Sequence, residues 1–561
     1  MSNQDSDMPW LKSYPDDVPA LLPELRHANL GSLIDSFSEK FADQPAFSQY
    51  STTFSFEEIY EDAQAFGAYL QRKLNYEKGE RLALMMPNVL PYPIVLYGCF
   101  MAGIVAVNIN PLYTPNEIRI QLTDSSVRGI VISEAFIARF LSVRRYLPQL
   151  RDIIIVQNGD GHGFFEKKAI NLAAKKYSKQ FPKTTVDNAI FYKEIISKGS
   201  RLALKTSTCL DKDVALLQYT GGTTGSCKAA VITHRNLMAN VAQITQWCSK
   251  TIEEPDMLSI LALPLYHIFS LTVNLLCIPS LGIHSRLILD PRDTKNFIKT
   301  MKKNPFSIIC GVNTLFKNLL DQDEFRKLDF SRLRFAIAGG MELDEEVSDR
   351  WFEITGNRIV EGYGLTEASP IVCVNLLDTD KYTGGVGYPL PDTKIKICDE
   401  RGIKLPADTA GELWVKGPQV MQGYWKYSDE TRKVLTADNW LKTGDIATLN
   451  KDGFVKIVAR KKDLIIVSGF NVYPSEVEAV LKKHPDVMEA AVVGEKNTEH
   501  GEKITAFIQK RENSQLSEET LRNLVRKFLT NYKRPSKYVF IDEMPKSPVG
   551  KILKYKLLET L

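Results

Sequence analysis

The chain has 561 residues, of which 44% are hydrophobic and 25% charged, and its formal net charge is +4. This length predicts roughly three or four compact units, and the charge is too small to indicate a nucleic-acid partner. The eight cysteines are scattered and form no CxxC pair, which argues against a disulfide framework and a structural zinc site. The first ten residues are polar and acidic, unlike a signal peptide. We therefore expect a protein of the reducing cytoplasm.

Two apolar stretches could be mistaken for membrane spans. Residues 94–107 are uninterrupted but short of the roughly 20 residues that a helix needs to cross a bilayer. Residues 258–289 are longer, but His267, Asn274, His284 and Arg286 interrupt them. We interpret both stretches as buried core, and peripheral contact with the inner face of a membrane stays open as an alternative.

Short apolar runs alternate with helical patterns up to about residue 460. Apolar and β-branched residues fill positions 129–134, 214–220, 306–312 and 334–340. Such runs between helices predict parallel strands buried on both faces, and hence an α/β fold. Residues Leu237, Val241, Ile244 and Cys248 then recur at helical spacing. We therefore predict a strand–loop–helix unit at 214–248, whose helix N-terminus would favour anions.

The pattern changes near Pro389. Glycines, prolines and short strand-like runs predict a smaller, mostly antiparallel and β-barrel-like segment at about 389–459. Residues 463–561 are enough for a separate α+β domain. Within it, Ser475 and Glu478 predict a capping box, and Ser517 should begin a second helix.

The stretch QYTGGTTGSCKAAVITHRNL, residues 218–237, begins with a loop suited to phosphates. Its glycines and hydroxyl side chains are followed by a lysine: Thr220, Gly221, Gly222, Thr223, Thr224, Gly225, Ser226 and Lys228. It is not a Walker A loop, because that motif requires Gly-Lys-[Ser/Thr]. Turns rich in glycine and threonine are common, so this loop alone does not define a function.

Four further motifs follow in the chain. EGYGLTEASP (361–370) puts Tyr363 between glycines, where its ring can lie against a base, and offers Glu367 as a Mg²⁺ ligand. WLKTGDIA (440–447) places Asp445 after a glycine turn, where it could bind ribose hydroxyls. ARKKDLIIVSGFNVYPSEVE (459–478) carries a basic cluster, and MPKSPVGKI (544–552) carries Lys551. Taken singly, each has an ordinary explanation as a core aromatic, a turn aspartate or a solvated charge.

In this order, the five motifs resemble those of the adenylate-forming enzymes, which include acyl- and aryl-CoA ligases, firefly luciferase and peptide-synthetase adenylation domains. The resemblance covers nearly the whole chain. The wording YTGGTTG, LPLYHIF (263–269), GVNTLF (311–316) and SGFNVYP (468–474) is most similar to bacterial long-chain fatty-acid–CoA ligases.

The resemblance implies a nucleotide site. The phosphates of ATP would be held by Thr220, Gly221, Gly222, Thr223, Thr224, Gly225 and Lys228, although the family usually has glycine where this chain has Ala229. The adenine would face Gly339, Gly340, Glu361, Gly362 and Tyr363, with Thr366 toward the phosphates. Asp445 and Arg460 would bind the ribose, and Mg²⁺ would lie at Thr220 and Glu367.

The resemblance also implies the remaining roles. Catalysis would depend on Lys551, His267, Glu367 and Thr220. Gly311 and Val312 would line the acyl pocket, and Ser468 and Gly469 the tunnel for CoA. Lys462 would be the hinge, at 460–462, between an N-terminal domain (1–459) and a small, mobile C-terminal domain (463–561).

The implied reaction has two steps. A fatty-acid carboxylate attacks the α-phosphate of ATP, pyrophosphate leaves, and the CoA thiol then displaces AMP from the acyl-AMP. Because two anions meet in the first step, the protein must supply positive charge, which Mg²⁺ and a positioned lysine provide. The partners are thus a fatty acid, ATP and CoA, and a homodimer stays open.

Other interpretations remain at this point. The nearest is the same ligase acting on a medium-chain or aryl acid such as coumarate. A luciferase-type oxygenase would share the adenylation residues. A peptide-synthetase module is disfavoured because no Gly-Gly-x-Ser attachment site follows Lys551. A lipid-binding protein without catalysis would have no need of Lys551, Glu367 and Asp445.

Overall fold

The structure is a computed structural model. It describes the chain except for residues 1–7, 164–165, 169, 171–185, 187, 206–207, 221–226, 249–255, 468–469, 498–500 and 548–549. The chain divides into two compact units. The α/β unit comprises Tyr14–Thr393 with Lys416–Leu435, and the terminal unit comprises Met1–Ser13, Lys394–Val415 and Thr436–Leu561.

The α/β unit contains an eight-stranded sheet. Its strands, in spatial order, are β19 (Gly423–Tyr424), β9 (Lys228–Thr233), β8 (Val214–Thr220), β4 (Val105–Asn108), β3 (Arg81–Met85), β5 (Gly129–Ser133), β6 (Asp152–Val156) and β7 (Ile190–Phe191). The six strands from β8 to β7 pair in parallel, whereas β9 and β19 are antiparallel. The apolar cluster around Val107, Ile130, Ile132 and Leu217 is buried, as expected for strands covered by helices.

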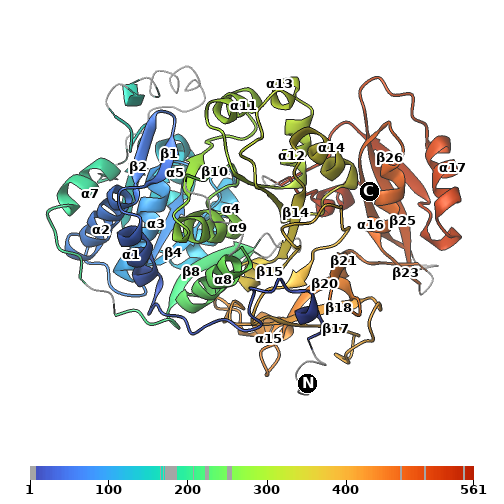
Figure 1. Cartoon of the computed structure of the whole chain (residues 1–561), viewed down its shortest axis with the longest axis horizontal. Coiled ribbons are helices and arrows are strands. Elements are labelled where there is room, and N and C mark those ends of the chain that lie inside the picture. The colour runs from blue at the N-terminus through green and yellow to red at the C-terminus, as the bar shows by residue number, and fades with distance from the viewer. Residues whose placement is uncertain are drawn as a thin grey trace. The chain divides into compact units, whose positions relative to one another are not determined.

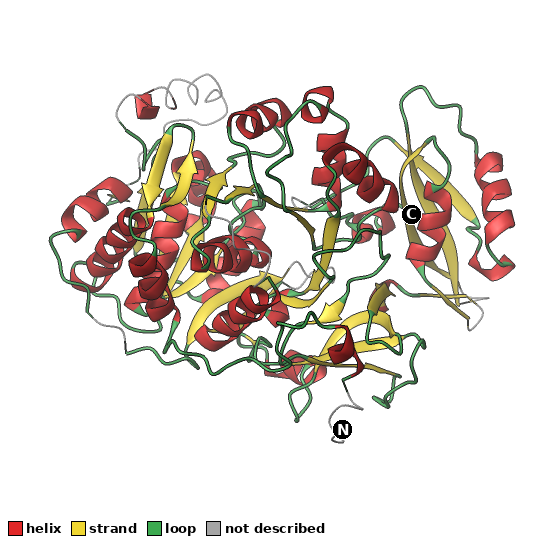
Figure 2. Ribbon diagram, viewed as in Figure 1, coloured by secondary structure: helices red, strands yellow, loops and turns green. Residues whose placement is uncertain are grey.

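A nine-stranded sheet completes this unit (Figures 1 and 2). Its order is β16 (Tyr388–Pro389), β15 (Ile371–Val374), β14 (Ile359–Gly364), β13 (Phe335–Ala338), β12 (Ile308–Gly311), β10 (Leu258–Leu261), β11 (His284–Leu287), β1 (Pro45–Gln49) and β2 (Thr52–Ser55). The strands from β14 to β1 are parallel, whereas β15, β16 and β2 are antiparallel. The predicted parallel strands and the α/β fold are therefore confirmed.

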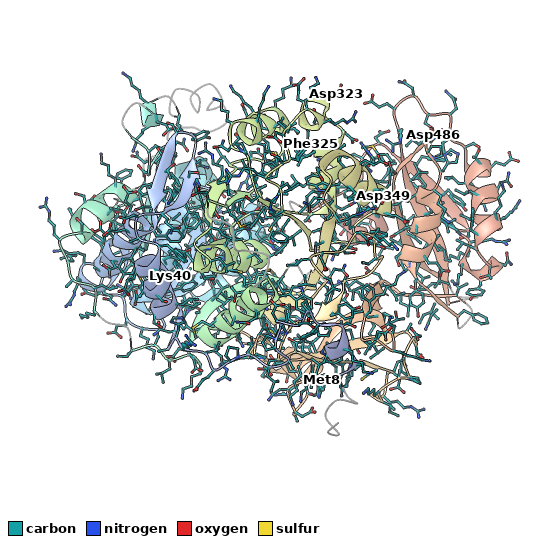
Figure 3. All side chains as sticks on the ribbon, viewed as in Figure 1. Met8, Lys40, Asp323, Phe325, Asp349 and Asp486 are labelled. Atoms are coloured by element: carbon teal, nitrogen blue, oxygen red, sulfur yellow. The ribbon has the colours of Figure 1, made fainter. Side chains whose placement is uncertain are left out.

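Helices of several lengths accompany these sheets. They are α1 (Leu30–Lys40), α2 (Phe56–Arg72), α3 (Pro91–Ala102), α4 (Pro115–Ser125), α5 (Ile137–Arg144), α7 (Tyr192–Gly199), α8 (His234–Trp247), α9 (Ile268–Ser270), α10 (Ile278–Ser280), α11 (Thr294–Lys303), α12 (Asn313–Leu320), α13 (Asp323–Arg326), α14 (Glu345–Thr355) and α15 (Ser428–Val434). A π-helical segment, η4 (Leu271–Cys277), joins α9 to α10. In α13, Phe325 packs 5.5 Å from the ring of Trp351, while Asp323 is exposed (Figure 3).

Both apolar stretches are core. Every residue of α3 is buried, and so are all residues of η4. Within the described part of the chain, no helix is both long enough and apolar enough to cross a bilayer.

The terminal unit has two sheets. Strands β17 (Lys394–Cys398), β18 (Gly411–Lys416), β20 (Leu441–Leu449) and β21 (Val455–Arg460) form one, in which β18, β20 and β21 pair antiparallel. The other contains β23 (Phe470–Val472), β22 (Ile465–Val467), β25 (Gly501–Lys510), β24 (Val487–Asn497) and β26 (Lys537–Ile541). Its helices are α16 (Pro474–Lys482), α17 (Glu518–Phe528) and α18 (Lys554–Leu558), of which α16 and α17 lie beside the strands in Figure 1.

Ser517 caps α17 as predicted, because its side chain accepts from the N–H of Thr520. The prediction of a capping box at Ser475 and Glu478 was wrong. The hydroxyl of Ser475 donates to the carbonyl of Val458, and Glu478 accepts from the N–H of Val492 at 2.7 Å and pairs with Lys554 at 2.8 Å. Partners elsewhere in the terminal unit thus replace the local cap.

The predicted strand–loop–helix unit was also wrong in its second half. The loop is followed by β9, which pairs with β8 from Thr220–Lys228 back to Val214–Thr233, and only then by α8. Since β9 runs back along β8 for six residues, at about 3.3 Å each, the N-terminus of α8 lies at the far end of the hairpin. It is not available to phosphates at the loop.

Candidate active site

Four strands of the nine-stranded sheet end side by side. Gly311 of β12 is opposite Ala338 of β13, which is opposite Glu361 of β14, and β10 pairs with β12 on the other side. Because these strands are parallel, the residues that follow them leave the sheet at one edge. Ligands in α/β proteins bind at this carboxyl edge.

Two glycines follow β13 at this edge. A Cβ on Gly339 would lie 3.1 Å from the ring of Phe269, and Gly340 has a φ of +80°, which favours glycine. The N–H of Leu343 donates to Glu361 Oε1 at 3.4 Å, so the buried Glu361 supports the turn after these glycines. The chain therefore passes close to the sheet edge and leaves its backbone accessible there.

Gly311 and Val312 follow β12. A Cβ on Gly311 would meet the ring of Phe316 at 2.9 Å, so the space beside this glycine is filled by α12. Val312 is partly buried against an apolar cluster that includes Leu263, Phe269 and Val273. The site therefore has an apolar side next to Val312.

A tight turn carries Glu367. Gly362 and Tyr363 lie near the end of β14, and Thr366 begins the turn η5 (Thr366–Ala368), which packs against β8 and β9. Tyr363 is buried, whereas Thr366 and Glu367 are partly exposed. The hydroxyl of Tyr424 donates to Glu367 Oε1 at 2.7 Å. Glu367 is thus held at the end of the hairpin formed by β8 and β9.

This hairpin presents Thr220 and Lys228 on either side of its loop. The two residues are paired in register, and the Thr220 hydroxyl donates to the carbonyl of Lys228 at 3.3 Å. The ammonium of Lys228 pairs with Glu430 and lies 5.5 Å from the centre of the Tyr424 ring. Gly221, Gly222, Thr223, Thr224 and Gly225 lie outside the described residues. Ala229 is buried in regular strand, so its methyl group adds to the core.

His267 lies after β10, in a loop fixed by two buried amides. Asn88 donates to the carbonyl of Leu263 at 3.0 Å and accepts from the N–H of Leu265 at 2.9 Å. Gln218 of β8 donates to the carbonyl of Tyr266 at 3.1 Å. These bonds connect the histidine loop to the hairpin strand.

The ring of His267 is neutral at physiological pH. Its burial disfavours the charged form and lowers its pKa to about 4. Nδ1 accepts from the N–H of Phe269 at 3.4 Å. The proton of the neutral ring therefore resides on Nε2, which can donate to an anionic ligand.

In the terminal unit, Asp445 and Arg460 form an ion pair. They are opposite each other on β20 and β21, and Arg460 Nε is 2.9 Å from Asp445 Oδ1. Asp445 is buried, and its N–H donates to the Thr443 hydroxyl at 3.1 Å. The predicted glycine turn is not present, because Gly444 lies within β20 next to Asp445; its φ of +70° nevertheless favours glycine.

Lys551 and Lys462 share this electropositive environment. Crowding by protein atoms and repulsion from Arg460 and Lys462 lower the pKa of Lys551 to about 8, although part of the residue remains exposed. Crowding by protein atoms likewise lowers the pKa of Lys462, although the residue is exposed. Ser468 and Gly469 lie outside the described residues.

The donors at Glu367 suit Mg²⁺ brought by a triphosphate. Among the described residues, no group of three or more His, Cys, Asp or Glu could hold a metal ion. Mg²⁺ on nucleotides commonly uses one or two carboxylates and completes its octahedron with phosphate oxygens and waters. One carboxylate, Glu367, on a turn that packs against β8, the strand that ends at Thr220, fits that arrangement.

Two family profiles match most of the chain. The profile of the AMP-binding enzyme family matches residues 34–425, and that of the AMP-binding enzyme C-terminal domain matches residues 476–551. The chain belongs to the AMP-binding enzyme family.

Named relatives and a solved structure extend the match. The chain is 44% identical to a long-chain-fatty-acid–CoA ligase of Yersinia pestis, covering 98% of this chain and 97% of the relative. It is 29% identical to a 4-coumarate–CoA ligase of Pinus taeda, covering 96% and 97%. The ATP-bound structure of MatB from Rhodopseudomonas palustris superposes with a TM-score of 0.81 at 25% identity, covering 95% and 99%. The resemblance inferred from the motifs is thus confirmed.

Three residues of this AMP-binding enzyme escaped the sequence analysis: Asn88, Tyr424 and Glu430. Each contacts a residue that the motifs singled out or the loop that carries one. Tyr424 lies in the stretch GPQVMQGYW (417–425), whose sequence gives no sign of a role for this hydroxyl. Asn88 and Glu430 lie outside every motif and give no sequence signal.

Proposed function

We propose that this AMP-binding enzyme converts a long-chain fatty acid to its CoA thioester at the expense of ATP, through an acyl-AMP intermediate, with release of pyrophosphate and AMP. The observation that carries the proposal is the 44% identity to a long-chain-fatty-acid–CoA ligase over nearly the whole of both chains. ATP and CoA are accordingly its co-substrates.

The carboxyl edge of the nine-stranded sheet supports a proposal for part of the nucleotide site. The backbone at Gly339, Gly340 and Gly362 would face the adenine together with Tyr363, and Thr220 and Lys228 with the glycine loop would bind the phosphates. Asp445 with Arg460 would bind the ribose. A buried carboxylate with an ordered counter-charge is a strong hydrogen-bond acceptor for hydroxyl groups.

Mg²⁺ would be held by Glu367 and Thr220, and would supply neutralisation of charge on the phosphates. His267 would donate from Nε2 to the fatty-acid carboxylate, so the carboxylate is oriented without a charged histidine. Gly311 and Val312 would lie beside the acyl chain.

The proposed mobile C-terminal domain supplies a lysine for the first step of the reaction. We propose that Lys551 binds the carboxylate and the α-phosphate during adenylation, and that Lys462 is the hinge (460–462) between domains at 1–459 and 463–561. Ser468 and Gly469 would then line the CoA tunnel. Because fatty acids partition into bilayers, peripheral contact with the inner membrane face belongs to the same proposal.

Chain-length profiling tests the substrate. AMP and CoA-thioester formation would be measured with Mg²⁺·ATP across saturated acids from acetate to palmitate, with oleate and coumarate. A maximum at C14–C18 is expected. A maximum at medium-chain or aryl acids would retain the two-step reaction and overturn the long-chain assignment. AMP formation without thioester would overturn CoA as the acceptor.

A further inference from the structure

Four side chains form a continuous cluster at the end of the β8–β9 hairpin. The Tyr424 hydroxyl donates to Glu367 Oε1 at 2.7 Å, and the Tyr424 ring lies 5.5 Å below the ammonium of Lys228. The same ammonium pairs with Glu430. One tyrosine therefore contacts both the carboxylate expected to serve the metal and the lysine expected to serve the phosphates.

Tyr424 is held firmly on the protein side. It belongs to β19, where it is paired with Ala230 of β9, and its N–H donates to the Thr431 hydroxyl at 2.8 Å. A Cβ on the preceding Gly423 would lie 2.6 Å from Thr431, so the strand packs closely against the start of α15. The ring thus has little freedom to move away from Glu367.

Glu367 is bound to the same strand segment by its backbone. Its carbonyl accepts from the N–H of Met421 at 2.8 Å. The carboxylate then accepts the Tyr424 hydroxyl through Oε1, and among the described residues no partner reaches Oε2. Two attachments therefore fix the direction in which Oε2 points.

The phenol stays protonated and acts as a donor. A phenol has an ordinary pKa of about 10, so the hydroxyl carries its proton near neutral pH and donates it to Glu367 Oε1 at 2.7 Å. A hydrogen bond from a neutral donor to a charged acceptor is stronger than one between neutral groups. The pair is therefore suited to holding a rotatable carboxylate in one orientation.

We propose that Tyr424 is a positioning residue, which orients Glu367 so that Oε2 faces the cation of Mg²⁺·ATP. This inference rests on the proposed function, because it takes Glu367 as the metal carboxylate. Tyr424 itself touches neither substrate nor metal. Because its ring also lies under Lys228, Tyr424 contacts both the residue proposed to bind the metal, Glu367, and a residue proposed to bind the phosphates, Lys228.

A double-mutant cycle on nucleotide binding tests this role. Dissociation constants for ATP would be measured by calorimetry without fatty acid, once with Mg²⁺ and once with EDTA. Tyr424→Phe is expected to weaken Mg²⁺·ATP binding about tenfold, the size of one hydrogen bond to a charged group, and to leave binding in EDTA unchanged. In a Glu367→Gln background, Tyr424→Phe should have no further effect.

Tyr427→Phe is the matched control. This tyrosine lies three residues away and is exposed, and its substitution should leave both dissociation constants unchanged. Equal weakening with Mg²⁺ and with EDTA would overturn the proposal, as would additive effects of the two substitutions. If Tyr424→Phe does not fold, 3-fluorotyrosine at position 424 keeps the packing and changes only the donor, and an Mg²⁺-specific change is again expected.

The outcome is separable from that of the proposed function. A wild-type protein that binds Mg²⁺·ATP with the expected cycle but forms no acyl-AMP from any fatty acid would overturn the function and leave the role of Tyr424 intact. If the wild-type protein forms long-chain acyl-CoA but the effects of Tyr424→Phe and Glu367→Gln are additive, the proposed function stands and the role of Tyr424 is overturned.

Discussion

Arg460 lies directly opposite Asp445 on adjacent strands, with its Nε 2.9 Å from Asp445 Oδ1. Because Asp445 is buried, its carboxylate needs this counter-charge, and the pair presents an ordered anion to a ligand.

Asp445→Asn should therefore weaken ATP use. Loss of a hydrogen bond to a charged group costs about 1.5–3 kcal/mol, so kcat/KM for ATP should fall about 10- to 100-fold. If Asp445 binds ribose, 3′-deoxy-ATP should lose activity in the wild type and lose no more in the variant. Asp452→Asn, on an exposed turn of the same unit, is the control and should behave as wild type. A full further loss with the deoxy analogue would argue against ribose binding.

The pKa of Lys551 predicts a pH dependence of adenylation. The groups facing it are Arg460 and Lys462, which lower the pKa, and Asp445 and Asp463, which oppose them. Since only the protonated amine can neutralise a carboxylate and a phosphate, kcat/KM for adenylation should fall as pH rises through about 8. Pyrophosphate exchange measures this step without the CoA thiol.

Two variants test the assignment of that titration. Lys462→Met removes a like charge, so the fall should move to higher pH. Lys551→Arg keeps a charge that does not titrate, and its residual activity should show no fall near pH 8. An unchanged profile in both variants would place the titration on another group.

Gly364 allows the turn that carries Glu367. It sits at a bulge between β14 and β15, where a Cβ would lie 2.2 Å from the carbonyl oxygen of Pro370. Gly364→Ala should force the backbone apart, cost about 1–3 kcal/mol of stability and weaken Mg²⁺·ATP binding. Gly163→Ala, where a Cβ meets nothing within 4 Å, should leave the unfolding midpoint unchanged. Equal midpoints for both variants would show that the turn relaxes without cost.

Asn88 should matter for the acid more than for ATP. Asn88→Ala would leave the N–H of Leu265 without its partner, at about 1–3 kcal/mol for a buried group, whereas the carbonyl of Leu263 keeps the Ser270 hydroxyl at 3.0 Å. The loop that carries His267 should loosen, so KM for fatty acid should rise more than KM for ATP. Asn116→Ala, on the exposed face of α4, is the control. Equal increases in both KM values would indicate general destabilisation.

The sequence predicted the parallel strands well because their residues are buried on both faces. Runs such as residues 214–220 carry enough apolar and β-branched side chains to identify β8 unaided. The strand β9 was missed because KAAVIT begins with a lysine and two alanines, which are poor strand formers. The alanines belong there because pairing with β8 and burial in the core outweigh local propensity.

Contacts between segments that are distant in the chain could not be predicted from the sequence. Ser475 and Glu478 have the spacing of a capping box, yet Val458, Val492 and Lys554 satisfy them instead. Likewise, Tyr424 and Glu367 are 57 residues apart, and Lys228 and Glu430 are 202 apart. Motifs predict which residues contact a ligand. The side chains that position those residues come from distant parts of the sequence and can be identified only from the folded structure.

The pair between Lys228 and Glu430 yields the last prediction. The ammonium groups of Lys228 and Lys433 lower the pKa of the partly exposed Glu430 to about 2, so this carboxylate is charged throughout the working pH range. A triphosphate that binds Lys228 must compete with it. Ion pairs near the surface contribute little, so Glu430→Gln should tighten Mg²⁺·ATP binding up to about fivefold. The gain should shrink as salt is added, because salt screens the competing charge.

Asp429→Asn is the matched control, since Asp429 pairs with Arg432 rather than Lys228. Weaker binding by Glu430→Gln would instead mean that Glu430 holds Lys228 ready for the nucleotide.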